Sequence, residues 1–126
     1  MYHGIIIDQE FIDKSFPKSF KVFAKRQAFT WGIYGIEIGD SELQEAIAKI
    51  QAHMKISQPW YAHLYNDSVL IVIFKDKVIK VKPQKTSWKP IIDYGMKLNI
   101  SEKQLDFWPN RFQDEIHYFK EKDFRR

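Results

Sequence analysis

The sequence WYAHLYNDSVLIVIFKDKVIKVK, residues 60–82, decides the fold. Apolar, aromatic and β-branched residues, which strands favour, form three short runs in it: 60–65, 69–74 and 78–82. The turn sequences Asn-Asp-Ser and Asp-Lys separate the runs, and Asp suits such positions because its short side chain tolerates unusual backbone angles. The middle run is apolar on both faces, which is typical of a strand at the centre of a sheet.

The rest of the chain supplies further strands and the helices. Strand composition recurs at 2–8, at 31–38 and at 20–26, although a short helix beginning at Pro17 fits the last of these nearly as well. Helices are expected where apolar residues recur at the spacing of one helical face: at 43–54, at 87–98 and from Asn110 onward.

Local signals mark where these helices begin and end. Ser41 with Gln44, and Ser101 with Gln104, have the form of capping boxes, in which side chain and backbone satisfy each other's N–H groups. Asn99 is placed to end its helix in the left-handed conformation.

Runs of strands joined by tight turns, with separate helices, predict an α+β fold. We expect a mostly antiparallel sheet of five or six strands, with two or three helices packed mainly on one face. The other face would then be open and partly solvated. One domain is expected over residues 1–120, followed by a frayed basic tail at 121–126.

Composition excludes several classes of protein. The chain has 126 residues and is 44% hydrophobic, which is enough for one core. It has no cysteine, so disulfides, thiolate metal sites and cysteine nucleophiles are excluded. The N-terminal apolar run is three isoleucines followed by acidic residues, which is neither a signal peptide nor a membrane span. We therefore expect a cytoplasmic protein.

The alternation in 60–65 presents one candidate site. Trp60, Ala62 and Leu64 share the parity that suits the core, and the other parity carries Tyr61, His63 and Tyr65. Histidine shuttles protons near neutral pH, and two phenols could bind or polarise a ligand beside it. His3 would join them if its strand is a neighbour. The alternative is that these side chains only cover the open face, where aromatic cross-strand pairs stabilise a sheet.

A lysine cluster at 75–89 presents a second candidate. The net charge is +4, and this short region carries six lysines against Asp76 alone. Such a cluster could bind nucleic acid without sequence preference, with Phe74 and Trp88 stacking on bases. The alternative is that lysines on an edge strand prevent pairing with another molecule. The six lysines are Lys75, Lys77, Lys80, Lys82, Lys85 and Lys89.

Other chemistry finds little support in the sequence. The four histidines have no metal-binding spacing, no phosphate-binding glycine motif is present, and the serines lie at caps and turns. Asp106 lies among large apolar residues in LDFWPN; it could be a buried acid with a raised pKa, but a turn cap before Pro109 is the preferred interpretation. We predict no metal and no cofactor.

Five phrases occur in order along residues 2 to 109: YHGIIID, WYAHLYND, FKDKVIKV, SWKPIIDYGMKLNI and QLDFWP. Together they resemble a widespread family of short bacterial proteins that has no established activity. In that family glycine often stands at the position of Asn99 and proline at that of Ser101, which fits a helix that stops and restarts there. The resemblance implies a bacterial cytosolic protein and transfers no catalytic or binding residue.

The preferred hypothesis is a small non-catalytic binding or regulatory module that acts through the open sheet face. Its binding residues would be Tyr61, His63, Tyr65 and His3, and its partner another protein or a second copy of the chain. One alternative is a small hydrolase or isomerase with His63 as general acid or base, assisted by Tyr61 and Tyr65. A weaker alternative is nucleic-acid binding through the 75–89 lysines.

Overall fold

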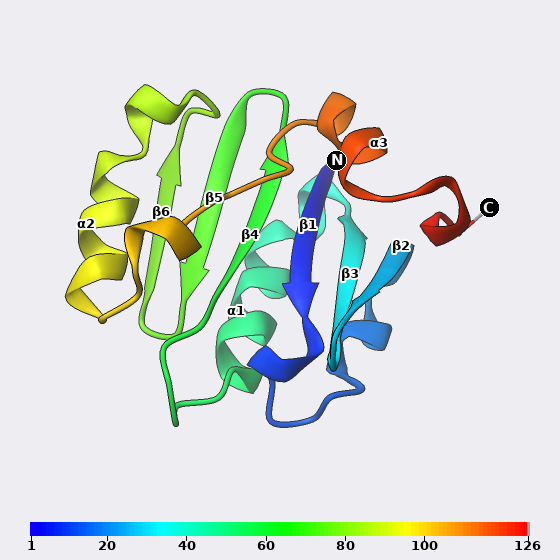
Figure 1. Ribbon diagram of the computed structural model, residues 1–126, viewed down its shortest axis with the longest axis horizontal. Helices are drawn as coiled ribbons and strands as arrows, with labels where there is room; N and C mark the ends of the chain where they lie inside the picture. Colours follow the sequence, from blue (N-terminus) through cyan, green and yellow to red (C-terminus); the bar gives the residue numbers. More distant parts are fainter. Residues whose placement is uncertain (126) are drawn as a thin grey trace.

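A computed structural model describes residues 1–125 of the protein and confirms the α+β class (Figure 1). All six strands join one antiparallel sheet in the order β2-β3-β1-β4-β5-β6. The strands are β1 (Tyr2–Ile7), β2 (Lys21–Ala28), β3 (Trp31–Ile38), β4 (Tyr61–Asn66), β5 (Val69–Phe74) and β6 (Lys77–Val81). Of residues 20–26, which were ambiguous in sequence, all but Phe20 belong to strand β2.

Three α-helices accompany the sheet: α1 (Leu43–His53), α2 (Lys89–Lys97) and α3 (Glu115–Tyr118). Short 3₁₀ helices form at Asp8–Glu10, Phe16–Ser19, Asp40–Glu42, Lys85–Ser87, Glu102–Gln104, Phe112–Asp114 and Glu121–Asp123. None of the described helices is long and apolar enough to cross a membrane.

The helix ends follow the sequence only in part. Asn99 adopts the predicted left-handed conformation, with φ of 68°. The capping box predicted at Ser41 does not form, because a 3₁₀ helix precedes α1 and no side chain caps either helix. At Ser101 the hydroxyl contacts the Gln104 side chain at 3.2 Å, and no side chain caps the backbone there.

Strand β1 lies in the middle of the sheet because its side chains are apolar on both faces. It pairs with β3 on one side and with β4 on the other, and His3 faces Glu37 and Tyr65 across the two ladders. Two segments far apart in the sequence, the β2–β3 hairpin and the β4–β5–β6 meander, are thereby joined into one sheet.

Both faces of the sheet are covered, which corrects the predicted open face. On one face α1 packs through Leu43, Ala46, Ile47 and Ile50 against a core that includes Ala62 and Leu64. On the opposite face lie α2 and the chain that follows it (Figure 1). We call residues 100–119 the crossing segment. The helices are thus divided between the two faces, because the second face also carries large apolar side chains that must be buried.

The crossing segment runs over β5 and β4 from α2 toward α3. Its apolar anchors Leu105, Phe107 and Phe119 are buried in the core of that face. The helix predicted from Asn110 is short, since only Glu115–Tyr118 is α-helical and Ile116 is exposed.

The tail expected to fray from residue 121 packs against β2 instead. Phe124 forms a bridge with Ala24, and the Arg125 N–H donates to the Phe23 carbonyl oxygen at 2.9 Å. Residue 126, the last of that predicted tail, lies outside the described residues.

Candidate functional site

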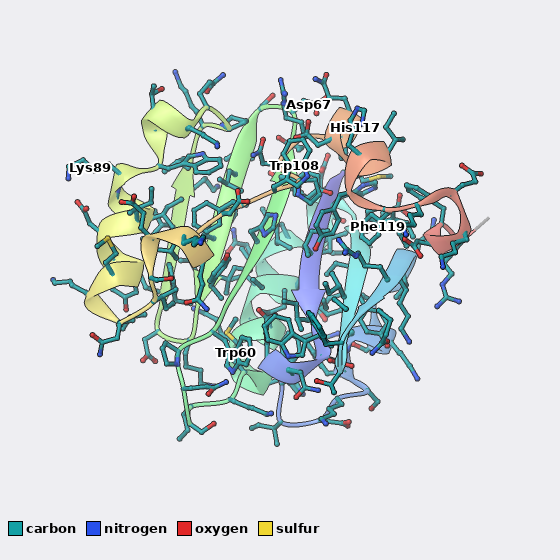
Figure 2. All side chains as sticks on the ribbon, viewed as in Figure 1. Trp60, Asp67, Lys89, Trp108, His117 and Phe119 are labelled. Carbon is teal, nitrogen blue, oxygen red and sulfur yellow. The ribbon has the colours of Figure 1, made fainter. Side chains whose placement is uncertain are left out.

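A cavity of about 470 Å³ lies between the sheet and the crossing segment. The sheet contributes Ile5 and Ile7 from β1, and Tyr61 and His63 from β4. Three tryptophans also line it: Trp60 just before β4 and Trp108 on the crossing segment (Figure 2), and Trp31, whose ring contacts that of Trp60. No lysine or arginine belongs to its wall in the part of the chain that the structure describes.

The alternate side chains Tyr61, His63 and Tyr65 of β4 attach the crossing segment to the sheet. The Tyr61 hydroxyl donates to the Gln104 carbonyl oxygen at 2.5 Å, and His63 Nε2 contacts the Pro109 carbonyl oxygen at 2.7 Å. The Tyr65 hydroxyl donates to Glu115 Oε2 at 2.5 Å. Three alternate side chains of one strand therefore bond, in order, to three successive points of the segment that covers them. We call these bonds the β4 attachments.

His63 is neutral near physiological pH. Burial lowers the pKa of its imidazole to about 4. The hydrogen bond to Pro109 raises the pKa, but it offsets only part of the effect of burial. A carbonyl oxygen can only accept, so Nε2 carries the proton and Nδ1 is left as the acceptor of the ring. The wall of the cavity thus includes an uncharged imidazole with a defined tautomer.

Glu10 places a carboxyl group in the same cavity. Its side chain is buried, and Oε1 accepts the Ile7 N–H at 3.0 Å. Burial raises the pKa of this carboxyl well above its ordinary value, and the nearby Asp8 adds to the effect. The sequence did not single out Glu10, because it lies among the polar residues that follow the first strand and these are typical of a connection.

Trp60 does not belong to the row of core side chains, with Ala62 and Leu64, in which the sequence alternation placed it. It precedes β4, is half-buried, and its ring meets Trp31 edge-on with the centroids 5.7 Å apart. Its indole Nε1 is buried and has no hydrogen-bond partner among the described residues. An orphaned buried donor is uncommon in proteins and costs about 1–3 kcal/mol.

The other two residues predicted for this site, His3 and Tyr65, meet at Glu115 instead. His3 Nδ1 lies 2.6 Å from Glu115 Oε2, which also accepts from Tyr65, and His3 Nε2 lies 3.5 Å from Glu37. His3 stacks on Phe23 with the ring centroids 4.1 Å apart. This cluster binds α3 to the sheet. Within residues 1–125 no group of three acidic or histidine side chains is arranged to hold a metal ion.

Asp106 is exposed and lies at the edge of the cavity, so its interpretation as a buried acid is wrong. The burial of Leu105 and Phe107 on either side of it turns the intervening side chain outward.

The lysines at 75–89 do not gather around a binding surface with exposed aromatics. Phe74 and Trp88, which were to stack on bases, are buried in the core. Lys75 donates to the Gln51 carbonyl oxygen and Lys89 pairs with Asp93 at 3.0 Å. Strand β6 is an edge of the sheet, where lysines oppose pairing with another chain. The two lysines of β6, Lys77 and Lys80, are exposed there, and so is Lys82 just after the strand.

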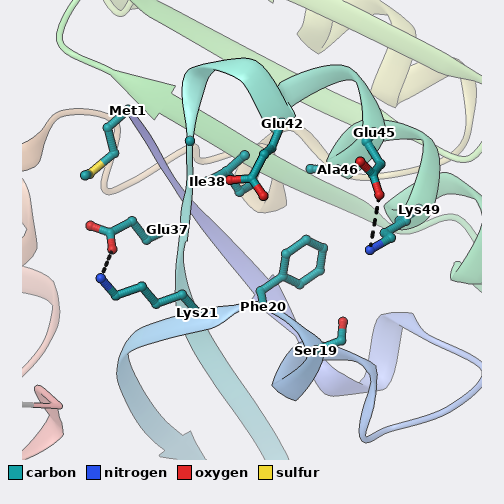
Figure 3. A pocket seen from close by; sticks show the side chains of 11 residues that line it. Met1, Ser19, Phe20, Lys21, Glu37, Ile38, Glu42, Glu45, Ala46 and Lys49 are labelled. Carbon is teal, nitrogen blue, oxygen red and sulfur yellow. Dashed lines mark ion pairs between the residues drawn. The ribbon is translucent and has the colours of Figure 1, made fainter.

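Two other hollows are less suited to a ligand. One, of about 330 Å³, lies between β2, β3 and α1, and its charges neutralise one another in the pairs Lys21–Glu37 and Lys49–Glu45 (Figure 3). The other, of about 520 Å³, shares Asp106 and Trp108 with the main cavity and is lined by the charged side chains of Lys85, Arg111 and Asp114 as well. Arg111 there faces Asp114 at 3.6 Å.

Comparisons with protein-family models, with curated proteins and with solved structures find no match to the chain. The resemblance to a family of short bacterial proteins therefore stays a prediction, and function is argued from the cavity and its walls.

Tyr65→Phe should destabilise the protein by about 1–3 kcal/mol, because it deletes the hydroxyl that Glu115 accepts and leaves a buried carboxylate oxygen with one partner fewer. Urea unfolding followed by tryptophan fluorescence measures the change. Tyr34→Phe is the matched control, since Tyr34 is also buried and its hydroxyl has no hydrogen bond to the described residues. Equal losses for the two variants would refute the structural role of this attachment.

Acidification should destabilise the wild type through His63. The unfolded chain takes up this proton near the ordinary pKa of 6.5, whereas the folded protein does so only near 4. The unfolding free energy should therefore fall by roughly 3 kcal/mol as pH drops through that window.

In His63→Gln, which retains a donor for Pro109, this loss should be absent, so the stability advantage of the wild type should shrink from pH 7 to pH 4. Glu10 titrates in the opposite sense, since a raised pKa gives stability at low pH that is lost as pH rises, but its contribution cancels in the comparison. Exposed His117→Gln is the control. Parallel pH curves for wild type and His63→Gln would contradict the burial of a neutral imidazole.

Proposed function

We propose that the protein is a small-molecule binding module whose site is the cavity between β1, β4 and the crossing segment. The observation that carries this proposal is the lining of the cavity, in which isoleucine and aromatic side chains surround a few polar groups; its volume of about 470 Å³ also lies within the range of ligand sites, roughly 300–1,000 Å³. The class of function remains the non-catalytic binding module predicted from sequence, but the site moves from an open sheet face to the space beneath its cover.

The wall chemistry favours an uncharged, largely apolar ligand. Isoleucine and aromatic side chains make most of the sheet side of the cavity, and His63 is neutral there. Burying an unpaired charge in such surroundings is costly. An anion has no lysine or arginine to pair with among the lining residues, and it would meet Glu10 and Asp106 instead.

A protein partner would have to use another surface. The row of β4 side chains that was to contact it, Tyr61, His63 and Tyr65, is occupied by the crossing segment. The same attachments hold one wall of the cavity in place, which suits a site that is formed before its ligand arrives.

The uncharged fluorophore N-phenyl-1-naphthylamine should bind the wild type with a rise in emission and one site per chain. Ile7→Trp should weaken this binding by at least tenfold, because Ile7 is half-buried on the cavity wall and a larger side chain would fill the space. A fluorescence titration measures both affinities.

The matched control is Ile12→Trp, which adds the same side chain at an exposed position outside the three cavities described above. It should bind as the wild type does. No binding to the wild type, or unaltered binding to Ile7→Trp, would refute the proposal that this cavity is the ligand site.

A second candidate function is proton transfer catalysed in the same cavity. His63 lines the cavity and keeps Nδ1 unprotonated, so this nitrogen could act as a base, and Glu10 has a carboxyl group that retains its proton to higher pH than usual. Such a pair could enolise a ketone: Nδ1 takes a proton from the carbon beside the carbonyl, the C–H electron pair forms the C=C bond, and the carboxyl protonates the oxygen. An imidazole whose pKa is about 4 is a weak base, which is why binding is the preferred function.

If this second function holds, the wild type should accelerate exchange of the methyl protons of 2-acetylnaphthalene for deuterium in D₂O, measured by proton NMR. His63→Gln should lower the enzymatic rate about a hundredfold, the lower range for general acid–base catalysis. His117→Gln should leave the rate unchanged, because His117 is exposed and does not line the cavity. The same rate in the wild type and His63→Gln would end the proposal of catalysis and leave that of binding untouched.

A further inference from the structure

Strand β6 leaves the backbone of one sheet edge unpaired. It is the outermost strand beside β5, and no backbone hydrogen bond joins Lys77–Val81 to described residues other than those of β5 (Figure 1). The opposite edge, β2, is already occupied by the C-terminal tail, since the Arg125 N–H donates to the Phe23 carbonyl oxygen at 2.9 Å. An extended segment therefore pairs with one edge of this sheet, and the other edge has the same kind of groups free.

The turn between β5 and β6 determines which backbone groups are free. Phe74 and Lys77 flank this two-residue turn and face each other, so they exchange both of their backbone hydrogen bonds. Hydrogen-bonded pairs alternate along an antiparallel ladder, so every second residue of β6 after Lys77 also bonds to β5. The N–H and C=O groups of the residues between them, Val78 and Lys80, consequently point away from the sheet.

The side chains at this edge are basic. Lys77, Lys80 and Lys82 are exposed, and none of them forms an ion pair with a described residue. Asp76 is the one carboxylate in the sequence from 75 to 89. Lysines at an edge oppose pairing through their charge, so they act against a second copy of this chain, which carries the same lysines. A strand with carboxylates opposite them is attracted instead.

We propose that β6 binds an extended acidic segment of another protein as an added antiparallel strand. This surface is separate from the cavity, and recognition there uses backbone hydrogen bonds for affinity and side-chain pairs for selection. The apolar positions of the edge are Val78, which is 37% exposed, and the half-buried Ile79 and Val81.

Pairing apolar with apolar and acidic with basic positions gives the complementary sequence Glu-Val-Glu-Ile-Val-Glu. In antiparallel register its first Glu lies opposite Lys82, its second opposite Lys80 and its last opposite Lys77. The second Glu and the second Val form the hydrogen-bonded pairs with β6, whereas the N–H of Ile points away from it.

This peptide, amidated and labelled with fluorescein, should bind the wild type in a fluorescence anisotropy titration. N-methylation of the second Glu should weaken binding at least tenfold, because it removes an N–H that donates to β6 and places a methyl group against the edge. N-methylation of the Ile is the matched control and should leave the affinity unchanged, since this nitrogen faces away from β6. The two peptides have the same charge and composition.

Two protein variants test the same edge from the other side. Val78→Pro should abolish binding, because it removes an outward N–H and leaves the ladder to β5 intact; cooperative urea unfolding checks its fold. Lys80→Glu should weaken binding about tenfold, since attraction becomes repulsion. Lys18→Glu makes the same charge change at an exposed position in the 3₁₀ helix before β2, and it should bind as the wild type does.

Each contrary result has a definite meaning. No binding of the peptide to the wild type, or equal weakening by the two N-methyl groups, would overturn the added strand. Equal affinities of Lys80→Glu and Lys18→Glu would overturn the selection of acidic segments. Tighter binding of a labelled oligothymidylate than of the peptide would assign the lysines to nucleic acid. A dimer of the free protein in sedimentation that Val78→Pro dissociates would assign the edge to a second copy.

Discussion

The fold depends on how the second face of the sheet is covered. That face carries two phenols and an imidazole on alternate positions of β4, all of which need hydrogen-bond partners once they are buried. The partners come from one segment, in order: the carbonyl oxygens of Gln104 and Pro109, and the carboxylate of Glu115. Because adjacent donors on a strand face are about 7 Å apart, these bonds set both the direction and the position of the crossing segment.

The attachments hold the crossing segment over the cavity. The crossing segment is bonded at three points along β4 and is anchored by Leu105 and Phe107. The space that remains lies beside Tyr61 and His63, next to the tryptophans at the end of the sheet. The residues that fasten the segment are therefore also residues of the candidate site.

Sequence reasoning predicted the elements better than the contacts. Alternation and turn residues were sufficient to predict the three strands within 60–82. The tolerance of asparagine for the left-handed conformation was sufficient to predict the end of the helix at Asn99. The same alternation could not show what lies opposite Tyr61, since its partner is 43 residues away along the chain. Trp60 was assigned to the wrong environment because a period of two holds only within a strand, and the strand begins one residue later.

Burial decides which chemistry the site can support. Removing His63 from water favours its neutral form, and removing Glu10 from water raises the pKa of its carboxyl, so the same physical cause acts against the charge of both groups. The cavity also has a few hydrogen-bonding positions, two of which, Tyr61 OH and His63 Nε2, are already used to attach the crossing segment. A ligand of the proposed kind would leave those bonds intact, so its affinity would depend mainly on contact with the rings that line the cavity.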